Sequence, residues 1–407
     1  MKGYLIVNVY VGSVANPVMN ALVKIREKEM AYFTDENGKT SKIELEVKDK
    51  NLSQEPNNNT EPYALYTITI SRPGLVTKTI KGVEIYPGIE SIQDVYLDTI
   101  DDKTVQEEVL EIDKSTLSFS AEYAPKIFEE EEENEKISLF VLPSVVIPEY
   151  IIVHDGTPSK ATAAKYYVTF TDYIKNVACC EIYPTWPKET IKANVLAIIS
   201  FTLNRIYTEW YHGKGFNFTI TSTTSYDHKY THGRTLFDTI VKLVDEIFNK
   251  YIKFPNRTEP YLAHYNDGIK LNNAGWLNQW GSKDLGDKGY SAIDILKHYY
   301  GKNLEINEST IYEGYPTSFP GFNLQLNACG EYVQKIQNEL NKIRGSYPAI
   351  PLISNSDGMY LETTKKAVEV FQKVFSLPIT GIVDFTTWYK ISYVFVAVTK
   401  MTEATYK

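Results

Sequence analysis

Apolar and polar residues alternate with a period of two over the first hundred positions of the chain. Every second residue from Leu5 to Val11 is aliphatic, and similar runs return at 63–71 and 83–97. The dipeptides Pro73-Gly74 and Pro87-Gly88 are typical of the turns between strands. The pattern predicts a small β-sandwich over residues 1–98, and no set of catalytic side chains stands out in it.

A helical period replaces the strand period in the centre of the chain. From Ile191 onward, apolar residues recur three or four positions apart, which predicts one long helix from Thr185 to Trp210. Thr185 suits the N-cap and Pro187 the first turn. Because the apolar stripe is broad, we expect the helix to be buried in the middle of a domain. Glu189 is the carboxylate of its first turn, and such a residue is most often a solvated, mildly stabilising charge.

Periodicity is lost between these two regions and returns as helices near the C-terminus. The acidic run Glu129–Glu133 indicates a flexible linker, and a protease-accessible pro-segment is the sharper alternative. A second central helix is predicted over 236–248. We therefore expect a multidomain α+β protein. Its predicted parts are the sandwich at 1–98, an acidic linker or pro-segment at 99–148, a central α+β domain at 149–315 and a unit of three helices at 321–405.

Length, charge and cysteine content exclude several classes of protein. A chain of 407 residues exceeds what one core usually supports. The net charge of −9 argues against general binding to nucleic acid or to an anionic membrane. Three cysteines without metal-ligand spacing favour neither a disulfide framework nor a zinc site. We expect no metal and no cofactor. The N-terminal residues lack the pattern of a signal peptide, and no apolar run suits a membrane span. We therefore expect synthesis in the cytoplasm.

The central region also contains segments whose side chains suit a carbohydrate cleft. The chain has 31 tyrosines, although most aromatic residues serve in ordinary cores. Flat aromatic faces match pyranose rings, and planar amides match hydroxyl groups. The candidate cleft walls, in segments that we expect to be polar loops, are Tyr265, Asp267, Gln279 and Trp280.

A second group of candidates lies at 226–228. Tyr226 and Asp227 are candidates for positioning a substrate, with an Asp-capped turn as the alternative. His228 either bonds to a sugar or packs in the core. For Arg205 we expect a structural ion pair.

The C-terminal unit resembles a known wall-binding domain. The resemblance rests on Val333–Gln337, Asp357-Gly358, Ala367–Gln372 and Gly381–Trp388. These segments are similar to the three-helix peptidoglycan-binding domain of type 1. The resemblance implies that peptidoglycan is the partner of this unit.

The central domain resembles the stage II sporulation protein D family. The similarity is carried by Glu189–Asn194, and it implies a lytic transglycosylase in which Glu189 is the catalytic acid and base. The order of modules is also similar to that of clostridial spore cortex-lytic enzymes of the SleC type. The chain departs from these relatives at His228, where they usually have Gln, and at Asn266 and Asn273, where they tend to have cysteines.

The resemblance implies a defined reaction. Glu189 would protonate the oxygen that leaves when the β-1,4 bond between N-acetylmuramic acid and N-acetylglucosamine breaks, and the muramic C6 hydroxyl would attack C1 to give a 1,6-anhydro product. A hydrolase would instead need two carboxylates about 5 to 9.5 Å apart. A general acid must keep its proton at neutral pH, which desolvation favours. We therefore expect Glu189 to be largely buried and to face a groove.

The resemblance also implies a biological setting. Relatives are stored as zymogens in the spore cortex and coat region, and a subtilisin-like protease activates them during germination by removing the N-terminal part. Two alternatives stay open. The first is a phage-tail or prophage lysin that acts with its N-terminal module in place, and the second is a catalytically degenerate scaffold that binds the wall.

Overall fold

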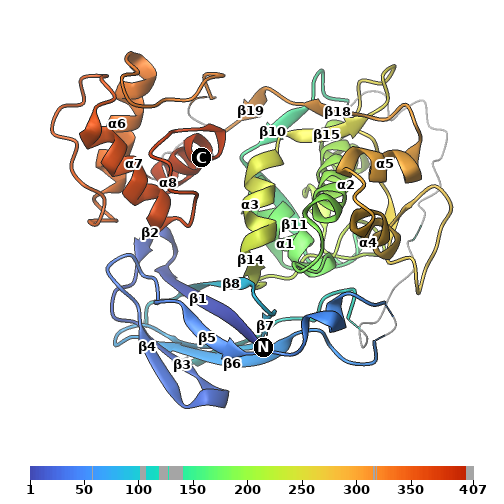
Figure 1. Cartoon of the computed structure of the whole chain (residues 1–407), viewed down its shortest axis with the longest axis horizontal. Coiled ribbons are helices and arrows are strands. Elements are labelled where there is room, and N and C mark those ends of the chain that lie inside the picture. The colour runs from blue at the N-terminus through green and yellow to red at the C-terminus, as the bar shows by residue number, and fades with distance from the viewer. Residues whose placement is uncertain are drawn as a thin grey trace.

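The computed structural model describes residues 1–56, 58–100, 107–118, 127, 141–314, 317 and 319–399. Figure 1 shows three units around a common centre: a strand-rich N-terminal unit in blue, a central unit that runs from green through yellow to light orange, and a helical C-terminal unit in deeper orange and red. The mixed α+β character predicted from the sequence is therefore present. The predicted domain boundaries stay predictions.

The N-terminal unit is built on two five-stranded sheets, one of which includes a two-residue strand from the central unit. The first has the order β14-β8-β1-β2 with β5 also paired to β1, and the second has the order β4-β3-β6-β7-β9. Aliphatic side chains from alternate positions, such as Val7, Val23 and Ile68, form one buried cluster, as the period of two predicts. The strands are β1 (Lys2–Val11), β2 (Ser13–Pro17), β3 (Leu22–Ile25), β4 (Met30–Phe33), β5 (Ile43–Glu46), β6 (Ala64–Ser71), β7 (Thr77–Ile85), β8 (Glu90–Leu97), β9 (Glu107–Glu111) and β14 (Leu236–Phe237). Two 3-10 turns span Arg26–Lys28 and Lys50–Ser53.

Two strands form inside the segment that we expected to be a structureless linker. β9 pairs in parallel with β7, and β10 (Val146–Pro148) pairs in parallel with β19 (Ile311–Glu313). Both strands are too short to show a period in the sequence, and their pairing partners lie elsewhere in the chain. The acidic run Glu129–Glu133 lies outside the described residues.

The central unit is organised around α2 (Lys188–Tyr207), of which 15 of 20 residues are buried. The expected central position of this helix is confirmed, but its expected start is wrong. Pro187 occupies the N-cap position without a side-chain cap, and the Thr185 hydroxyl instead lies 2.7 Å from that of Ser53. The other helices are α1 (Phe170–Glu181), α3 (Asp238–Ile247), α4 (Gln279–Asp287) and α5 (Ala292–Tyr300), with a 3-10 turn at His212–Lys214.

Small sheets surround these helices. They are β12 (Lys165–Thr169), β11 (Tyr150–His154) and β13 (Ile220–Thr221) in that order, β15 (Lys250–Lys253) with β18 (Glu305–Glu308), and β16 (Tyr265–Asn266) with β17 (Leu277–Asn278).

The C-terminal unit has the three helices that the sequence predicts: α6 (Glu331–Ile343), α7 (Glu362–Val374) and α8 (Phe385–Thr399). Buried Gln372 organises the turn between α7 and α8, because its side-chain oxygen accepts hydrogen bonds from the amides of Thr380 and Gly381, both at 2.9 Å. The rings of Phe385 and Tyr389 lie 5.1 and 5.5 Å from that of Phe248 in the central unit. The two units therefore share one hydrophobic cluster.

Candidate functional site

Glu189 lies in the first turn of α2, where its carboxylate contacts the start of α5. Its Oε2 accepts a hydrogen bond of 2.8 Å from the backbone N–H of Ala292. The first amides of a helix lack partners within the helix, and a carboxylate is a favourable one. Glu189 is half-buried, so the expectation of a largely buried side chain is wrong. The physical reason is this bond, which holds the carboxylate at the edge of the central unit.

The backbone that carries Glu189 is held by close packing of α4. A Cβ added to Gly286 would lie 2.0 Å from the Thr190 hydroxyl oxygen, so α4 approaches α2 as only glycine permits. The Asn194 amide donates to the Ser282 hydroxyl at 2.8 Å. On the other side, the Trp186 indole N–H donates to the Ser53 carbonyl at 2.8 Å. The start of α2 is therefore positioned by both the central and the N-terminal units.

Asp227 belongs to a buried network at the other end of α2. Its carboxylate accepts hydrogen bonds from Arg205 Nε at 3.0 Å, from the Tyr211 hydroxyl at 2.6 Å and from the Thr221 amide at 2.9 Å. The ion pair expected for Arg205 is therefore present. Arg205 follows Glu189 by 16 residues, which is about 24 Å along a helix. The structure does not bring Asp227 into one site with Glu189.

His228 and Tyr265 also lie along the second half of α2. The His228 ring is fully buried, lies 3.1 Å from the Tyr173 hydroxyl through Nδ1, and stacks on Tyr265 with a centroid distance of 5.7 Å. These contacts support the packing alternative for His228. Tyr226 is half-buried beside this network.

Asp267, Gln279 and Trp280 are buried as well. The Asp267 carboxylate accepts hydrogen bonds from the amides of Ile269, Lys270 and Leu271, at 2.9 to 3.1 Å, and so shapes its own turn. The Gln279 amide donates to a main-chain carbonyl, that of Glu181, at 3.0 Å.

Trp280 lies in a helix, so the expectation of a polar loop at this place is wrong. Asn278 is the N-cap of α4, and its side-chain oxygen accepts a bond of 2.7 Å from the Gly281 amide. The sequence carries this signal, an Asn before a short helix, but the polar residues around it conceal the helical period. The Trp280 indole packs edge-on against Trp186 at 5.0 Å and Tyr183 at 5.9 Å.

Two of the predicted cleft residues border a hollow between units. Asp267, Trp280 and Tyr183 line a cavity of about 270 Å³. Its other wall includes Leu52, Glu55, Pro56, Asn58, Asn59, Thr60 and Pro62 of the N-terminal unit. The aromatic surface next to the start of α2 is thus covered by the N-terminal unit rather than open.

A buried carboxylate at the start of the central unit was not predicted from the sequence. Glu149 is 3% exposed, and its burial raises its pKa to about 7. The available signal was a single Glu between Pro148 and the apolar strand β11. A cavity of about 540 Å³ where the three units meet was also missed, because its walls come from distant parts of the chain.

The two asparagines that stand in place of the cysteines implied by the resemblance are neighbours in the structure. The Asn266 side-chain amide donates to the Asn273 side-chain oxygen at 3.2 Å. Cys179 and Cys180 are buried and Cys329 is exposed, all as free thiols. Among the described residues, no group of three or more His, Cys, Asp or Glu side chains could hold a metal ion. In the same part of the chain, no helix has the length and apolar content needed to cross a membrane.

Comparison with known proteins identifies one domain. The family model described as a putative peptidoglycan binding domain matches residues 329–391, which run from just before α6 into α8. No curated protein and no solved structure matches the chain. The C-terminal unit therefore contains a peptidoglycan-binding domain, which supports a function at the cell wall.

Proposed function

We propose that this protein is a peptidoglycan lytic transglycosylase of the spore cortex, similar to enzymes of the SleC type, with Glu189 as its acid and base. The observation that carries the proposal is the peptidoglycan-binding match at 329–391, on helices that share a hydrophobic cluster with the central unit. A glycan strand bound by these helices would lie on a unit that packs directly against the one containing α2. The resemblance of Glu189–Asn194 to the stage II sporulation protein D family supports the choice of reaction.

In the proposed reaction, Glu189 transfers its proton to the glycosidic oxygen as the bond to muramic C1 breaks. The muramic C6 hydroxyl attacks C1 and returns its proton to the same carboxylate, so the 1,6-anhydro product forms without water and Glu189 is regenerated. The Ala292 amide holds Oε2, so Oε1 is the oxygen that exchanges the proton. The half-buried position of Glu189 allows a glycan strand to reach it.

In this proposal the N-terminal unit keeps the enzyme inactive by covering the aromatic surface beside the start of α2. Residues 52, 55–56, 58–60 and 62 form one wall of the cavity at Trp280. The Ser53 carbonyl accepts a hydrogen bond from the Trp186 indole N–H beside the start of α2. A cut by a subtilisin-like protease would break the covalent link between this covering segment and the central unit, and the segment would leave once the buried contacts between the two units, such as Arg234 with Glu84, also break. This part of the proposal rests on the cover over the aromatic surface and on the resemblance to cortex-lytic zymogens.

The test is mass spectrometry of soluble products from cortex peptidoglycan. A specific protease site is inserted after Glu133, and the intact and cut proteins are compared with Glu189→Gln and with a matched control, Glu246→Gln, whose exposed carboxylate lies 3.5 Å from Lys188. The cut protein and the control should release anhydro-muropeptides. Glu189→Gln should release at least about 100-fold less, since general acid–base catalysis contributes on that order.

Equal release from Glu189→Gln would exclude the proposed acid. Release from the intact protein would instead favour a phage-tail type of lysin that acts with its N-terminal unit in place. That alternative is favoured by the buried pair of Arg234 and Glu84, which builds the N-terminal unit into the central one.

A wall-binding scaffold without activity is the second candidate function. It is favoured by the contact in which Glu189 caps α5 and by the burial of Gln279 and Trp280, which leaves these predicted cleft walls inside the core. This function would be established if the protein sediments with the wall but neither the cut nor the intact form releases soluble product.

A further inference from the structure

A cavity of about 540 Å³ lies at the junction of the three units. Its walls come from β1 and β8 of the N-terminal unit, α1 and α3 of the central unit, and α7 and α8 of the C-terminal unit. Sites for small organic ligands typically measure about 300 to 1,000 Å³. The cavity therefore has room for a sugar with a short peptide.

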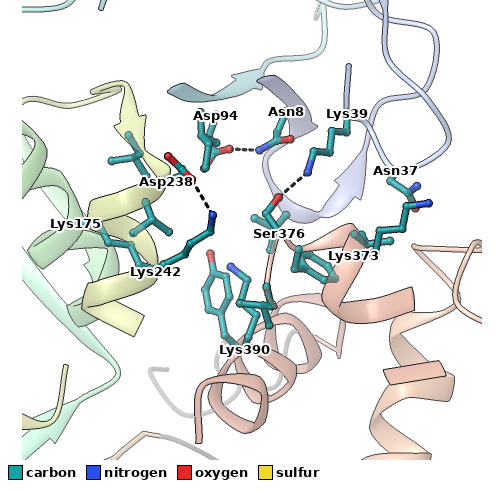
Figure 2. A pocket seen from close by; sticks show the side chains of 18 of the residues that line it. Asn8, Asn37, Lys39, Asp94, Lys175, Asp238, Lys242, Lys373, Ser376 and Lys390 are labelled. Carbon is teal, nitrogen blue, oxygen red and sulfur yellow. Dashed lines mark hydrogen bonds and ion pairs between the residues drawn. The ribbon is translucent and has the colours of Figure 1, made fainter. Parts of the chain in front are cut away.

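Two lysines reach into this cavity from opposite walls, as Figure 2 shows. Lys39 of the N-terminal unit donates to the Ser376 hydroxyl at 2.6 Å. The Lys390 ammonium lies over the rings of Tyr393 and Phe375, at 5.0 and 5.6 Å from their centroids. Among the described residues, no carboxylate lies within ion-pairing distance of either ammonium.

Both lysines are half-buried, and the loss of hydration lowers the pKa of each. For Lys390, the nearby charge of Lys175 lowers the pKa further. A partly desolvated positive charge without a carboxylate partner is costly, and a bound anion offsets that cost. The two lysines thus define an anion-binding position between the C-terminal and N-terminal units.

Carboxylates around the cavity raise the pKa of the two lysines, chiefly Glu90 for Lys39 and Asp172 for Lys390, but the loss of hydration lowers it by more. Three of the carboxylates that line the cavity have lysine partners of their own, and Asp172 is one of them, 4.0 Å from Lys175. Asp238 pairs with Lys242 at 2.7 Å, and Glu90 pairs with Lys42, also at 2.7 Å. Asp94 differs, since it accepts a hydrogen bond of 2.7 Å from a neutral amide, that of Asn8. It keeps capacity for a cationic group of a ligand.

Aromatic rings supply the remaining surface. Tyr10 and Tyr96 lie with their ring centroids 5.5 Å apart on the strand side of the cavity, and Tyr393 lines it from α8. Such faces pack against sugar rings and aliphatic stems. The cavity therefore combines lysines that can bind an anion, a carboxylate that can bind a cation, and an apolar aromatic surface.

We propose that this cavity binds the stem peptide of a peptidoglycan strand, with Lys39 and Lys390 taking its carboxylates and Asp94 its free ammonium group. The choice of ligand rests on the proposed function, because a stem peptide joins carboxylates and an amine to a sugar and the C-terminal unit contains the peptidoglycan-binding domain. One bound peptide would contact all three units. Since ligand that binds only the assembled form stabilises it, wall fragments would hold the N-terminal unit in place.

The test is calorimetric titration of the full-length protein with a soluble muramyl tripeptide whose third residue is a diamino acid. The same compound with its carboxylates amidated serves as the matched ligand. We expect binding of the carboxylate form and at least about tenfold weaker binding of the amide, because amidation removes the charge-assisted hydrogen bonds between the ligand carboxylates and the two lysines. The double variant Lys39→Gln/Lys390→Gln should lose affinity by a similar factor. Lys366→Gln, an exposed lysine of α7, should not.

A second readout uses the wild-type protein and does not depend on the folding of a variant. The bound tripeptide should slow the acylation of Lys390 by an amine-reactive reagent, and mass spectrometry measures the rate. Acetate at the same concentration should slow it less. Equal protection by acetate would mean a simple anion site and would overturn the proposal, as would equal affinity for the amidated ligand.

Failure of this inference is distinguishable from failure of the proposed function. If the protein still pellets with sacculi and releases products that depend on Glu189, but the tripeptide neither binds nor protects Lys390, only the junction site is wrong. If tripeptide binding depends on Lys39 and Lys390 but no form releases product, the junction site stands and the transglycosylase is wrong.

Discussion

At the scale of single residues, two carboxylates of the central unit differ because of their surroundings. Glu189 is half-buried and accepts a hydrogen bond from a helix amide. Glu149 is buried, its Oε1 has no hydrogen bond within the described residues, and a Cβ added to Gly314 would lie 2.9 Å from its Oε2. Loss of hydration raises the pKa of Glu149 to about 7 from an ordinary value of 4.5. The protein therefore binds a proton at Glu149 when it folds near neutral pH.

Glu149→Gln should stabilise the protein at alkaline pH and not at acidic pH. Below about pH 4.5 the carboxyl is protonated in both the folded and the unfolded state, so it does not lower the free energy of unfolding. As the pH rises toward 7, the unfolded state releases its proton first, so the wild type loses up to about 3 kcal/mol relative to the variant. Urea unfolding at pH 4.5 and pH 8 measures the difference. Glu313→Gln, an exposed neighbour, is the control, and identical pH profiles for wild type and Glu149→Gln would contradict the prediction.

At the scale of elements, the contact between α4 and α2 decides where Glu189 stands. α4 begins at an Asn cap and brings Gly286 against Thr190, while α5 supplies the Ala292 amide. The helix that carries the candidate acid is thus positioned by two short helices that follow it by about a hundred residues in the sequence.

Gly286→Ala should destabilise the protein by about 1 to 3 kcal/mol, because the new methyl group overlaps the Thr190 hydroxyl in a packed interface. It should also reduce product release by displacing the first turn of α2. The matched test is a double-mutant cycle with Thr190→Ala, which removes the overlapping oxygen. We expect the double variant to recover part of the unfolding free energy, and strict additivity of the two changes would show that the contact is not the cause.

At the scale of the whole molecule, the N-terminal unit is built into the central one. β14 of the central unit pairs with β8, and the Tyr86 ring packs edge-on against Phe237 with centroids 5.0 Å apart. The fully buried Arg234 guanidinium donates to both oxygens of Glu84, at 2.9 and 2.7 Å. A protease cut in the segment between the units therefore does not by itself separate them.

The cut protein should elute as one species in native gel filtration. Glu84→Gln should let the N-terminal fragment leave after the cut, since removing one partner of a buried ion pair costs about 3 to 5 kcal/mol. It should also speed product release if departure of that fragment is the activating step. Lys28→Gln, which breaks a surface pair with Glu46, should change neither. Two separate species from the cut wild type would contradict the prediction.

Local pattern in the sequence determined the elements with a clear period. The three C-terminal helices and the burial of α2 follow from apolar spacing, because the period of a helix or strand states which face must leave water. Apolar spacing did not predict β9 and β10, because these strands are too short to show a period. It also did not predict the helix at Trp280, where the capping Asn278 stands among other polar residues.

Only the tertiary structure decided what each candidate side chain does. Asp227 meets Arg205 rather than Glu189, and the cavity of Lys39 and Lys390 is assembled from segments more than 300 residues apart in the chain. A side chain's partners come from wherever the chain returns in space, and no local period carries that information. The sequence alone thus determined that the chain holds a helical unit of the peptidoglycan-binding type. The packing of three units on one another decided which carboxylate meets solvent and which lysines have no carboxylate partner among the described residues.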